Sequence, residues 1–473
     1  MDTADLVTIS EAATRVGKTI HNIRYYVDYG RIGKYGPNGE QIKGKARNGD
    51  LRVSLSELQI YLDLLKKGLS KHHRAGLNSE LGFYELPEYE RTKHVHRLHP
   101  YLGKFIPQLV EWFMTRYFKE DDIILDPFMG SGTALIQGNE LKMHTIGIDI
   151  SEFNCMIARV KTQKYNIAEV KNDIEKAERI LKYFGERLVS KDLKQLILFP
   201  EEDLKNLKES LMNEVDSDYL KTWFAERTLY EMIYYKRIIK ELTNRELLQV
   251  LLSRAVRSAR LVPHYDLARP KAPIEPDKEY WCKKHNRMCK PTDQLFIKIH
   301  NYSSDTIKRI ATFDKLRSNK SINIIQSDSR YVDLSAEIEG TPIAGRKIDG
   351  IFTSPPYVGQ IDYHEQHIYA YELFGISRND DKEIGPKRSG ATKEAQREYI
   401  NNIASVFRNV NRFLKDDAKI FIVANDKFKL YPEIAEKGGM KIIKEYHRAV
   451  TKRTEQGDNP YQETIFFMKK RSN

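Results

Sequence analysis

The stretch at residues 122–151, DIILDPFMGSGTALIQGNELKMHTIGIDIS, constrains the fold more than any other part of the sequence. Residues 123–125 are apolar and predict a short buried parallel strand, which ends at Asp126. Gly130 and Gly132 follow, and residues without a Cβ permit a tight turn whose backbone faces a ligand. A strand, a glycine turn and a helix in this order predict an open α/β sheet with a ligand at its carboxyl edge.

The same stretch continues with a helix that Thr133 is able to start and with a second strand that ends at Asp149. A carboxylate there is placed to accept hydrogen bonds from two ribose hydroxyls, and it argues against a phosphorylated ribose. The glycine spacing departs from the dinucleotide pattern G-x-G-x-x-G, because the third position is Gln137 or Gly138. No G-K-[ST] sequence follows, so ATP is also disfavoured.

A second motif stands at residues 347–357, KIDGIFTSPPY. Pro355 and Pro356 fix φ and cannot continue a sheet, so the backbone leaves the strand in a rigid, extended form. This turn presents the Ser354 hydroxyl and the Pro355 carbonyl as acceptors, with the Tyr357 ring beside them. Two acceptors that bind the protons of a nucleobase amino group favour a pyramidal nitrogen, whose lone pair then attacks a methyl carbon. Tyr357 is able to stack on a base extruded from the duplex.

With DPF before the glycine turn, the first motif resembles the FxGxG motif of S-adenosylmethionine-dependent amino methyltransferases, at Phe128, Gly130 and Gly132. SPPY resembles the catalytic motif [D/N/S]-P-P-[Y/F] of the DNA amino methyltransferases. The resemblance implies that Asp126 binds the methionine end of S-adenosylmethionine and that Asp149 binds the ribose. Serine in the first position is more typical of cytosine-N4 methylation and aspartate of adenine-N6 methylation, so cytosine N4 is favoured and adenine N6 is the alternative.

Other segments are similar to the same family. Residues 96–113 resemble the segment that precedes the first strand and closes over the cofactor, which nominates Lys104 and Phe105 as cofactor contacts. A later strand ends near Asp328, the position that lies near the adenine in the family. Residues 362–375 follow SPPY where the family has a helix that lines the base pocket. The last apolar runs predict a closing antiparallel hairpin, and the whole predicts a Rossmann-like methyltransferase sheet.

The order of the motifs, glycine turn first and SPPY second, is that of the α group, whose target-recognition region lies between the two. Here the gap opens before the Asp328 strand, earlier than in the family. An insertion of this size in an α/β domain usually forms a separate lobe on the ligand edge of the sheet. We therefore predict a winged helix-turn-helix domain at 1–65, a linker at 66–94, a catalytic domain at 95–164 and 321–473, and a helical insertion at 165–320 that is a candidate target-recognition lobe.

In the N-terminal domain, Ser10 is a good N-cap for a first helix and Thr19 for a second. Two helices, a Gly-rich hairpin and a last helix resemble the MerR/excisionase-like family of DNA-binding domains. The resemblance implies that the second helix enters the major groove and that the hairpin meets phosphates. The implied DNA contacts are Lys18, His21, Asn22, Arg24 and Tyr25 on the helix, and Lys45 and Arg47 on the hairpin. A small helical interaction module without DNA contact is the alternative.

The sequence YWCKKHNRMCKP spaces Cys282, His285 and Cys289 as C-x2-H-x3-C. Thiolates and imidazoles are good zinc ligands, but a structural site needs four ligands and the run supplies three. His264 or His300 is able to complete the set. We expect a basic loop with two reduced cysteines and no metal, and zinc is the alternative.

Lys and Arg number 78 and Asp and Glu 66, which gives a formal net charge of +12 and suits a polyanionic partner such as double-stranded DNA as well as it suits a solvated basic surface. Three cysteines make no disulfide framework, which fits a reducing cytoplasm. Apolar runs are too short for a membrane span, and the N-terminus does not resemble a signal peptide. We expect a cytoplasmic, nucleoid-associated protein.

Together these features predict a site-specific DNA methyltransferase that uses S-adenosylmethionine, delivers its target by base flipping, and belongs to a restriction–modification or defence system with a cognate restriction endonuclease. Besides adenine N6, two more distant functions stay open. One is an RNA amino methyltransferase, and the other is a non-catalytic DNA-binding regulator.

Overall fold

The computed structural model describes residues 3–28, 31–42, 51–66, 77–83, 86, 88–101, 103–189, 201–267, 270–282, 285–450 and 462–471. The chain divides into two compact units. The first comprises Met1–Glu88, Phe421–Lys429 and Ile442–Met468, and the second comprises Tyr89–Ile420, Leu430–Lys441 and Lys469–Asn473. The predicted domain boundaries follow the sequence motifs and stay a prediction.

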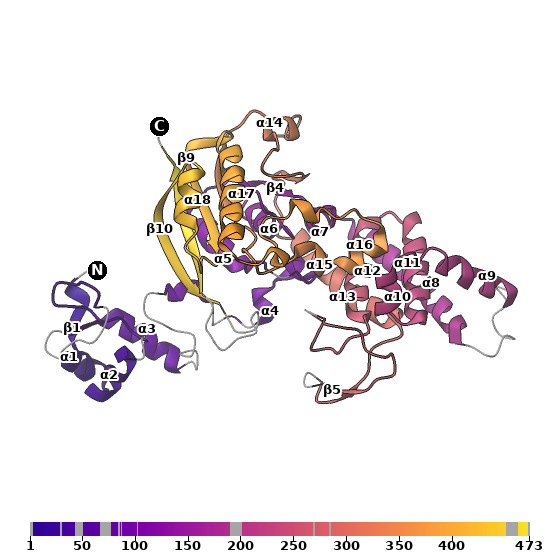
Figure 1. Ribbon diagram of the computed structural model, residues 1–473, viewed down its shortest axis with the longest axis horizontal. Helices are drawn as coiled ribbons and strands as arrows, with labels where there is room; N and C mark the ends of the chain where they lie inside the picture. Colours follow the sequence, from indigo (N-terminus) through magenta and orange to yellow (C-terminus); the bar gives the residue numbers. More distant parts are fainter. Residues whose placement is uncertain are drawn as a thin grey trace. The chain divides into compact units, whose positions relative to one another are not determined.

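The described N-terminal residues form three α-helices and a two-stranded sheet (Figure 1), which surround a small apolar core. The antiparallel strands pair Leu6 with Ser54 and Thr8 with Arg52. Ile23, Val53 and Leu58 are fully buried in the core that the helices share. The elements are β1 (Leu6–Thr8), α1 (Ile9–Val16), α2 (Ile20–Asp28), β2 (Arg52–Ser54) and α3 (Leu55–Lys66).

The first helix is capped by Thr8, so the prediction of Ser10 as its N-cap is wrong. The Glu11 amide donates to Thr8 Oγ1 at 3.1 Å, and the Thr8 amide donates to Glu11 Oε2 at 2.8 Å, which is a reciprocal capping box. The helix starts earlier because β1 delivers the chain directly into it. The second cap is confirmed, because the Asn22 amide donates to Thr19 Oγ1 at 3.1 Å.

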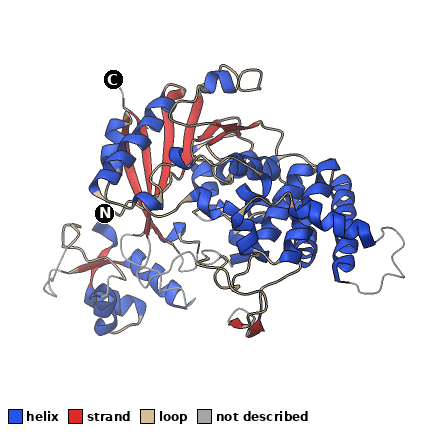
Figure 2. Ribbon diagram, turned by 45° about the vertical axis from the view of Figure 1, so that its right-hand side comes forward, coloured by secondary structure: helices blue, strands red, loops and turns tan. Residues whose placement is uncertain are grey.

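A seven-stranded sheet organises the α/β part of the chain, with the strand order β10-β11-β9-β8-β3-β4-β7. Figure 2 shows its strands in red with helices against them. The central strands β8, β3, β4 and β7 are parallel. The strands are β3 (Ile123–Asp126), β4 (His144–Asp149), β7 (Ile322–Gln326), β8 (Ile348–Thr353), β9 (Leu414–Ala424), β10 (Met440–Ala449) and β11 (Gln462–Lys470).

The register of the parallel strands brings their carboxyl ends to one edge. Asp126 pairs with Gly147, Leu125 with Ile351, and Asp149 with Gln326. Every residue of β3 is buried, as expected for a strand covered on both faces. The ends of β3, β4 and β8, far apart in the chain, therefore meet at one place where a ligand can be bound.

Helices follow most strands, as the alternating sequence pattern predicted. The helices of this part of the chain are α4 (Glu88–Arg91) and α5 (Pro107–Tyr117), which precede β3, and α6 (Thr133–Glu140), α7 (Glu152–Thr162), α14 (Leu334–Glu337), α15 (Tyr363–Gln366), α16 (Ile368–Phe374), α17 (Lys393–Asn411) and α18 (Tyr431–Lys437). Short 3-10 turns lie at Thr3–Asp5, Ser79–Leu81, His94–Arg97, Ile239–Glu241, Asp380–Lys382 and Lys387–Ser389. Among the residues described, none of the helices combines the length and apolar content needed to cross a membrane.

The insertion is helical, as predicted, but its core is not separate. Leu248 and Val256 of the insertion belong to the same buried cluster as Phe153 and Ile157 of α7 and Tyr369 of α16. The insertion therefore packs on the catalytic helices as one continuous core, and the expected separate lobe is wrong in this respect. Its elements are α8 (Ile167–Val189), α9 (Glu201–Met212), α10 (Asp218–Trp223), α11 (Glu226–Ile238), α12 (Arg245–Ala259), β5 (Tyr280–Cys282), β6 (Arg287–Cys289) and α13 (Leu295–Asp314).

Candidate active site

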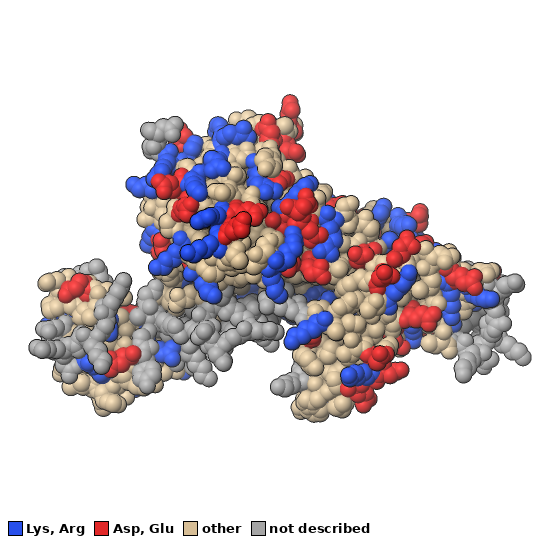
Figure 3. Space-filling model, in the orientation of Figure 1, with Lys and Arg blue, Asp and Glu red and all other residues tan. Residues whose placement is uncertain are grey.

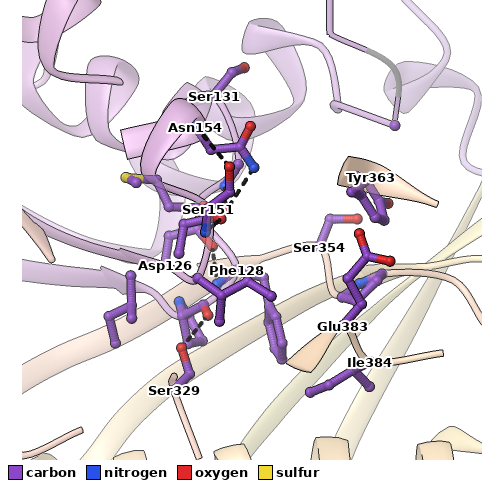
Figure 4. A pocket seen from close by; sticks show the side chains of 18 of the residues that line it. Asp126, Phe128, Ser131, Ser151, Asn154, Ser329, Ser354, Tyr363, Glu383 and Ile384 are labelled. Atoms are coloured by element: carbon purple, nitrogen blue, oxygen red, sulfur yellow. Dashed lines mark hydrogen bonds between the residues drawn. The ribbon is translucent and has the colours of Figure 1, made fainter. Parts of the chain in front are cut away.

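A single cleft at the carboxyl edge of the sheet collects most of the predicted site residues. Its space, with the open mouth included, is about 970 Å³. Figure 4 shows Asp126, Phe128 and Ser151 on one wall, with Ser354 and Glu383 across from them. The predicted residues that line the cleft are Lys104, Phe105, Asp126, Phe128, Gly130, Thr133, Asp149, Asp328, Ser354 and Pro356. Gly132, Pro355 and Tyr357 do not line it.

Asp126 is the last residue of β3, and its carboxyl group accepts two hydrogen bonds. Its Oδ1 accepts hydrogen bonds from Thr353 Oγ1 at 2.6 Å and from the Phe128 amide at 3.1 Å. Burial raises the pKa of Asp126 to about 7, and the two hydrogen bonds only partly offset that effect. A buried carboxyl of this kind favours a ligand group that donates hydrogen bonds or carries positive charge.

Asp149 ends β4 and organises the glycine turn. Its carboxylate accepts hydrogen bonds from the Gly130 amide at 2.9 Å, the Ser151 amide at 2.8 Å and Asn154 Nδ2 at 3.1 Å. Burial raises the pKa of Asp149 to about 6, against the lowering effect of these bonds. The side chain thus stays at the cleft wall in one orientation.

The two glycines of the motif have different roles. Gly130 has φ +51, and a Cβ there would lie 3.0 Å from Tyr101 Oη, at the cleft wall. Gly132 has φ +80, and a Cβ there would lie 3.2 Å from the Ala158 Cβ. Gly130 therefore keeps the turn open toward the cleft, whereas Gly132 permits α6 to approach α7.

Lys104 and Asp328 reach the cleft with partners that the sequence did not indicate. Lys104 Nζ donates to the His96 carbonyl at 2.6 Å, and burial beside two arginines lowers the pKa of Lys104 to about 8. Asp328 forms an ion pair with Arg330, whose Nη2 lies 2.6 Å from Oδ2. Arg330 also donates to Asn402 Oδ1 at 2.9 Å, which orders this wall.

The SPPY corner leaves β8 directly at the cleft. Ser354 Oγ donates to Tyr357 Oη at 3.4 Å, and the Pro356 carbonyl accepts a hydrogen bond from Tyr399 Oη at 2.9 Å. Pro355 is buried, and Tyr357 is only 9% exposed. The predicted stacking surface of Tyr357 is therefore not turned toward the cleft in this conformation, because the ring packs into the wall.

Several lining residues were missed by the sequence analysis, among them Tyr101, Ser151 and Asn154. On the opposite wall, the Tyr363 ring stacks with that of Tyr101 at a centroid distance of 6.3 Å. Tyr363 begins α15, within the segment that the resemblance assigned to a base pocket. Tyr101 lies within residues 96–113 and Ser151 ends the stretch at 122–151, so both stand in segments that were assigned to the cofactor, whereas no local pattern marks Asn154.

A buried hydrogen-bonded pair, His364 and Glu383, supports that opposite wall. His364 Nδ1 lies 2.6 Å from Glu383 Oε1, and Arg388 Nη1 lies 2.9 Å from Oε2. Burial alone would raise the pKa of Glu383, but the hydrogen bonds from His364 outweigh it and hold that pKa below its usual value. His364 and Glu383 both line the cleft.

The predicted DNA contacts of the N-terminal helix differ in exposure. Lys18, His21 and Tyr25 are exposed. Asn22 accepts a hydrogen bond from Thr19 Oγ1 at 2.8 Å, and Arg24 Nε lies 3.5 Å from Asp28 Oδ2. Lys45 and Arg47 lie outside the described residues. A direct DNA role therefore stays a prediction for all seven.

The positive charge is spread over the surface. On the face shown in Figure 3, lysines and arginines are interspersed with aspartates and glutamates over both the sheet region and the insertion. The net charge of +12 thus does not mark one binding stripe on this face.

The parallel sheet edge, with the glycine turn and SPPY on one cleft, has the α/β architecture of a methyltransferase. The DNA methylase family profile matches residues 69–160. The chain is 40% identical to the type II methyltransferase M.MjaII of Methanocaldococcus jannaschii, over 98% of this chain and 97% of that protein. It is 28% identical to the type II methyltransferase M.MvaI of Kocuria varians, over 39% of this chain and 36% of that protein. The chain therefore belongs to the type II methyltransferases, and the matched profile places it among those that methylate amino groups of DNA.

Among solved structures, the chain is similar to TrmN from Thermus thermophilus, with 10% identity and a TM-score of 0.26, over 78% of this chain and 50% of that chain. A score this low adds nothing to the assignment.

Proposed function

We propose that this chain is a site-specific DNA methyltransferase that transfers the methyl group of S-adenosylmethionine to the N4 amino group of cytosine. The observation that carries the proposal is that Ser354 lines the same cleft as Asp126 and Asp149. Serine at the first position of the tetrapeptide supports cytosine N4 over adenine N6, which is the alternative.

The residues of the cleft fit S-adenosylmethionine. The cofactor supplies an electrophilic methyl carbon on a sulfonium. The Asp126 carboxylate suits the ammonium of its methionine end, and the Asp149 carboxylate suits its ribose hydroxyls. Ser131 and Asn154 line the cleft, and Ser131 Oγ and Asn154 Oδ1 are, among the described residues, buried without a hydrogen-bond partner. Buried polar atoms of this kind fit a polar ligand, because leaving them unpaired costs free energy.

The protein's part in the methyl transfer is to position the amino group. The Ser354 hydroxyl lines the cleft and accepts one of its protons, which helps to localise the nitrogen lone pair for an in-line attack on the methyl carbon, whereas Pro355, predicted as the second acceptor, does not line the cleft in this conformation. With S-adenosylmethionine bound, the nitrogen–carbon bond would form as the methyl–sulfur bond breaks, the neutral thioether S-adenosylhomocysteine would leave, and the methylated cationic amino group would release one proton to solvent. An extruded base meets the aromatic face of Tyr363 in the cleft, because Tyr363 lines it and Tyr357 does not.

Double-stranded DNA is the proposed substrate. The N-terminal helices act as a winged helix-turn-helix domain, and the insertion contributes to target recognition. The type II relatives support a role in restriction–modification beside a cognate endonuclease. A match to a type II methyltransferase over 98% of this chain also favours DNA over RNA. Methyl transfer to tRNA but not to duplex DNA would reverse that choice.

The experiment is a transfer assay followed by base analysis. Duplex DNA is incubated with the protein and S-adenosylmethionine, digested to nucleosides and analysed by mass spectrometry. N4-methylcytosine is the expected product. N6-methyladenine would overturn the choice of base, and no methylated nucleoside on any duplex would overturn the proposed activity.

A further inference from the structure

Two histidines and two cysteines converge between α12 and α13, away from the cleft. Cys282 ends β5, Cys289 ends β6, and His285 lies in the turn between them. His264 comes from the loop that follows α12. One nitrogen or sulfur atom of each residue lies within 4.8 Å of the other three. A sequence spacing of three ligands thus becomes a set of four in the fold.

The distances within this cluster match the edges of a zinc tetrahedron. Cys282 Sγ lies 3.7 Å from His264 Nδ1 and 3.6 Å from His285 Nδ1. His285 Nδ1 lies 3.4 Å from Cys289 Sγ. Zinc–sulfur bonds of about 2.3 Å and zinc–nitrogen bonds of about 2.0 Å, arranged tetrahedrally, separate sulfur from nitrogen by about 3.5 Å. The four atoms are therefore spaced as ligands of one ion.

The orientation of the histidines supports the same centre. The rings of His264 and His285 lie with centroids 4.8 Å apart at an interplanar angle of 73°, and Nδ1 of each ring is the atom that lies near a cysteine sulfur, at 3.7 Å for His264 and 3.4 Å for His285. The His264 amide donates to Tyr280 Oη at 3.1 Å, which fixes the loop beside β5. His300, the other candidate from the sequence, is elsewhere, with Nδ1 3.1 Å from Glu178 Oε2.

Apolar packing does not explain the order of this region. Among the described residues between Pro263 and Lys290, only Cys282 is buried. Trp281 and Met288 on the hairpin are 53% and 50% exposed. A hairpin with three residues in each strand is not stable by itself in water. Small units of this kind depend on a covalent or metal cross-link.

We propose that His264 and His285, through Nδ1, and Cys282 and Cys289, as thiolates, bind one structural Zn²⁺. Two thiolates neutralise the charge of the ion, and four protein ligands leave no open coordination position, which is typical of a structural site. None of the four residues lines the cleft, so the ion takes no part in methyl transfer. The centre holds the β5–β6 hairpin to the end of α12.

The first test is the metal content of the full-length protein. The chain is expressed in zinc-containing medium, purified with a reductant and without added zinc, and analysed by plasma mass spectrometry. About one zinc per chain is expected for the wild type and for two controls. The controls are His300→Ala, the rejected fourth ligand, and Cys155→Ala, a buried cysteine outside the cluster. His264→Ala and Cys289→Ser are expected to lose most of the zinc. Wild-type protein with almost no zinc overturns the proposal, as does full retention in His264→Ala.

A second measurement on the wild-type chain removes any dependence on how the variants fold. Zinc is removed with a chelator and Co²⁺ is titrated in its place. Tetrahedral ligation by two thiolates is expected to give visible d–d bands and a thiolate-to-cobalt charge-transfer band that saturate at one equivalent. Hydrogen exchange is expected to rise after chelation in residues 262–294 and to stay unchanged in β3 and β4. A spectrum without the charge-transfer band, or a Cys282–Cys289 disulfide in the freshly purified protein, overturns the proposal.

Discussion

Thr353 Oγ1 donates a hydrogen bond of 2.6 Å to Asp126 Oδ1, and this bond joins the two motifs of the site. Thr353 is the residue directly before SPPY, and Asp126 is the residue that ends the strand before the glycine turn. Because the bond crosses neighbouring parallel strands, the proposed cofactor end and the proposed catalytic corner keep a constant distance from each other.

Cofactor affinity is expected to rise with pH. Burial raises the pKa of Asp126 to about 7 and that of Asp149 to about 6, and a ligand with an ammonium and hydroxyl groups prefers both as carboxylates. Calorimetry at pH 5.5, 6.5 and 7.5 is expected to show that the affinity falls as the pH is lowered. Each carboxyl group contributes a decrease of up to about tenfold per pH unit below its own pKa. An affinity that is constant over this range would contradict the expected carboxylate contacts.

The same two carboxyl groups have the opposite effect on the stability of the cofactor-free protein, which is expected to fall as the pH rises. Raised pKa values mean that the folded state binds more protons than the unfolded state. The stabilisation from these groups is therefore complete below pH 4 and is lost as the pH rises through 6 and 7. Cofactor addition is expected to raise the melting temperature more at pH 7.5 than at pH 5.5. A smaller increase at pH 7.5 contradicts this linkage.

Thr353→Val is expected to shift the pH profile of cofactor affinity. The Thr353 hydrogen bond lowers the pKa of Asp126, so its removal raises that pKa further and moves the midpoint of the profile to higher pH. Thr145→Val in β4 is the matched control, because Thr145 Oγ1 is buried and, within the described residues, has no hydrogen-bond partner. A profile that shifts equally in both variants would assign the effect to general repacking.

Gly130→Ala is expected to weaken cofactor binding by more than about tenfold, whereas Gly340→Ala leaves it unchanged. Both glycines have positive φ, +51 and +76, so both substitutions cost roughly 1–2 kcal/mol of stability. Only at Gly130 does the new Cβ approach a cleft residue, Tyr101, while nothing lies within 4 Å of it at Gly340. Melting temperatures measure the loss of stability in each variant, and calorimetry measures the cofactor affinity. Equal affinities in the two variants would contradict the role assigned to the turn.

Lys18→Ala is expected to weaken binding to duplex DNA and to reduce the salt slope of the affinity by about 1, as for the loss of one phosphate contact. Lys66→Ala, an exposed lysine on α3, is the control and is expected to leave the slope unchanged. Fluorescence anisotropy at several salt concentrations measures both. An unchanged slope for Lys18→Ala favours the alternative of an N-terminal module without DNA contact.

Local patterns were enough to predict several of the elements that line the cleft. Strand, turn and acidic end follow one another between residues 122 and 151, so Asp126, Gly130 and Asp149 were predictable from neighbours in the chain. The parallel register then explains why SPPY lies beside them. For the first helix the sequence indicated Ser10 as the N-cap, whereas the helix begins after Thr8, the last residue of β1.

Contacts between distant parts of the chain were not predictable in this way. Tyr101 and Asn154 face the cleft because of tertiary packing, and Tyr357 turns into the wall for the same reason. The insertion shares its core with α7 and α16, which periodicity does not reveal, since it indicates that a helix face is buried and not what covers it. The choice between His264 and His300 also depends on where two loops meet.

The most direct test of the account is a single-turnover methylation assay on Ser354→Ala beside Ser335→Ala, an exposed serine on α14. Removing the Ser354 hydroxyl, the proposed acceptor for an amino proton, is expected to slow methyl transfer by about 10²–10³-fold while cofactor affinity changes by less than about twofold. Ser335→Ala is expected to match the wild type in both measurements. Transfer by Ser354→Ala at the wild-type rate would contradict the claim that the SPPY corner and the glycine turn form one catalytic cleft.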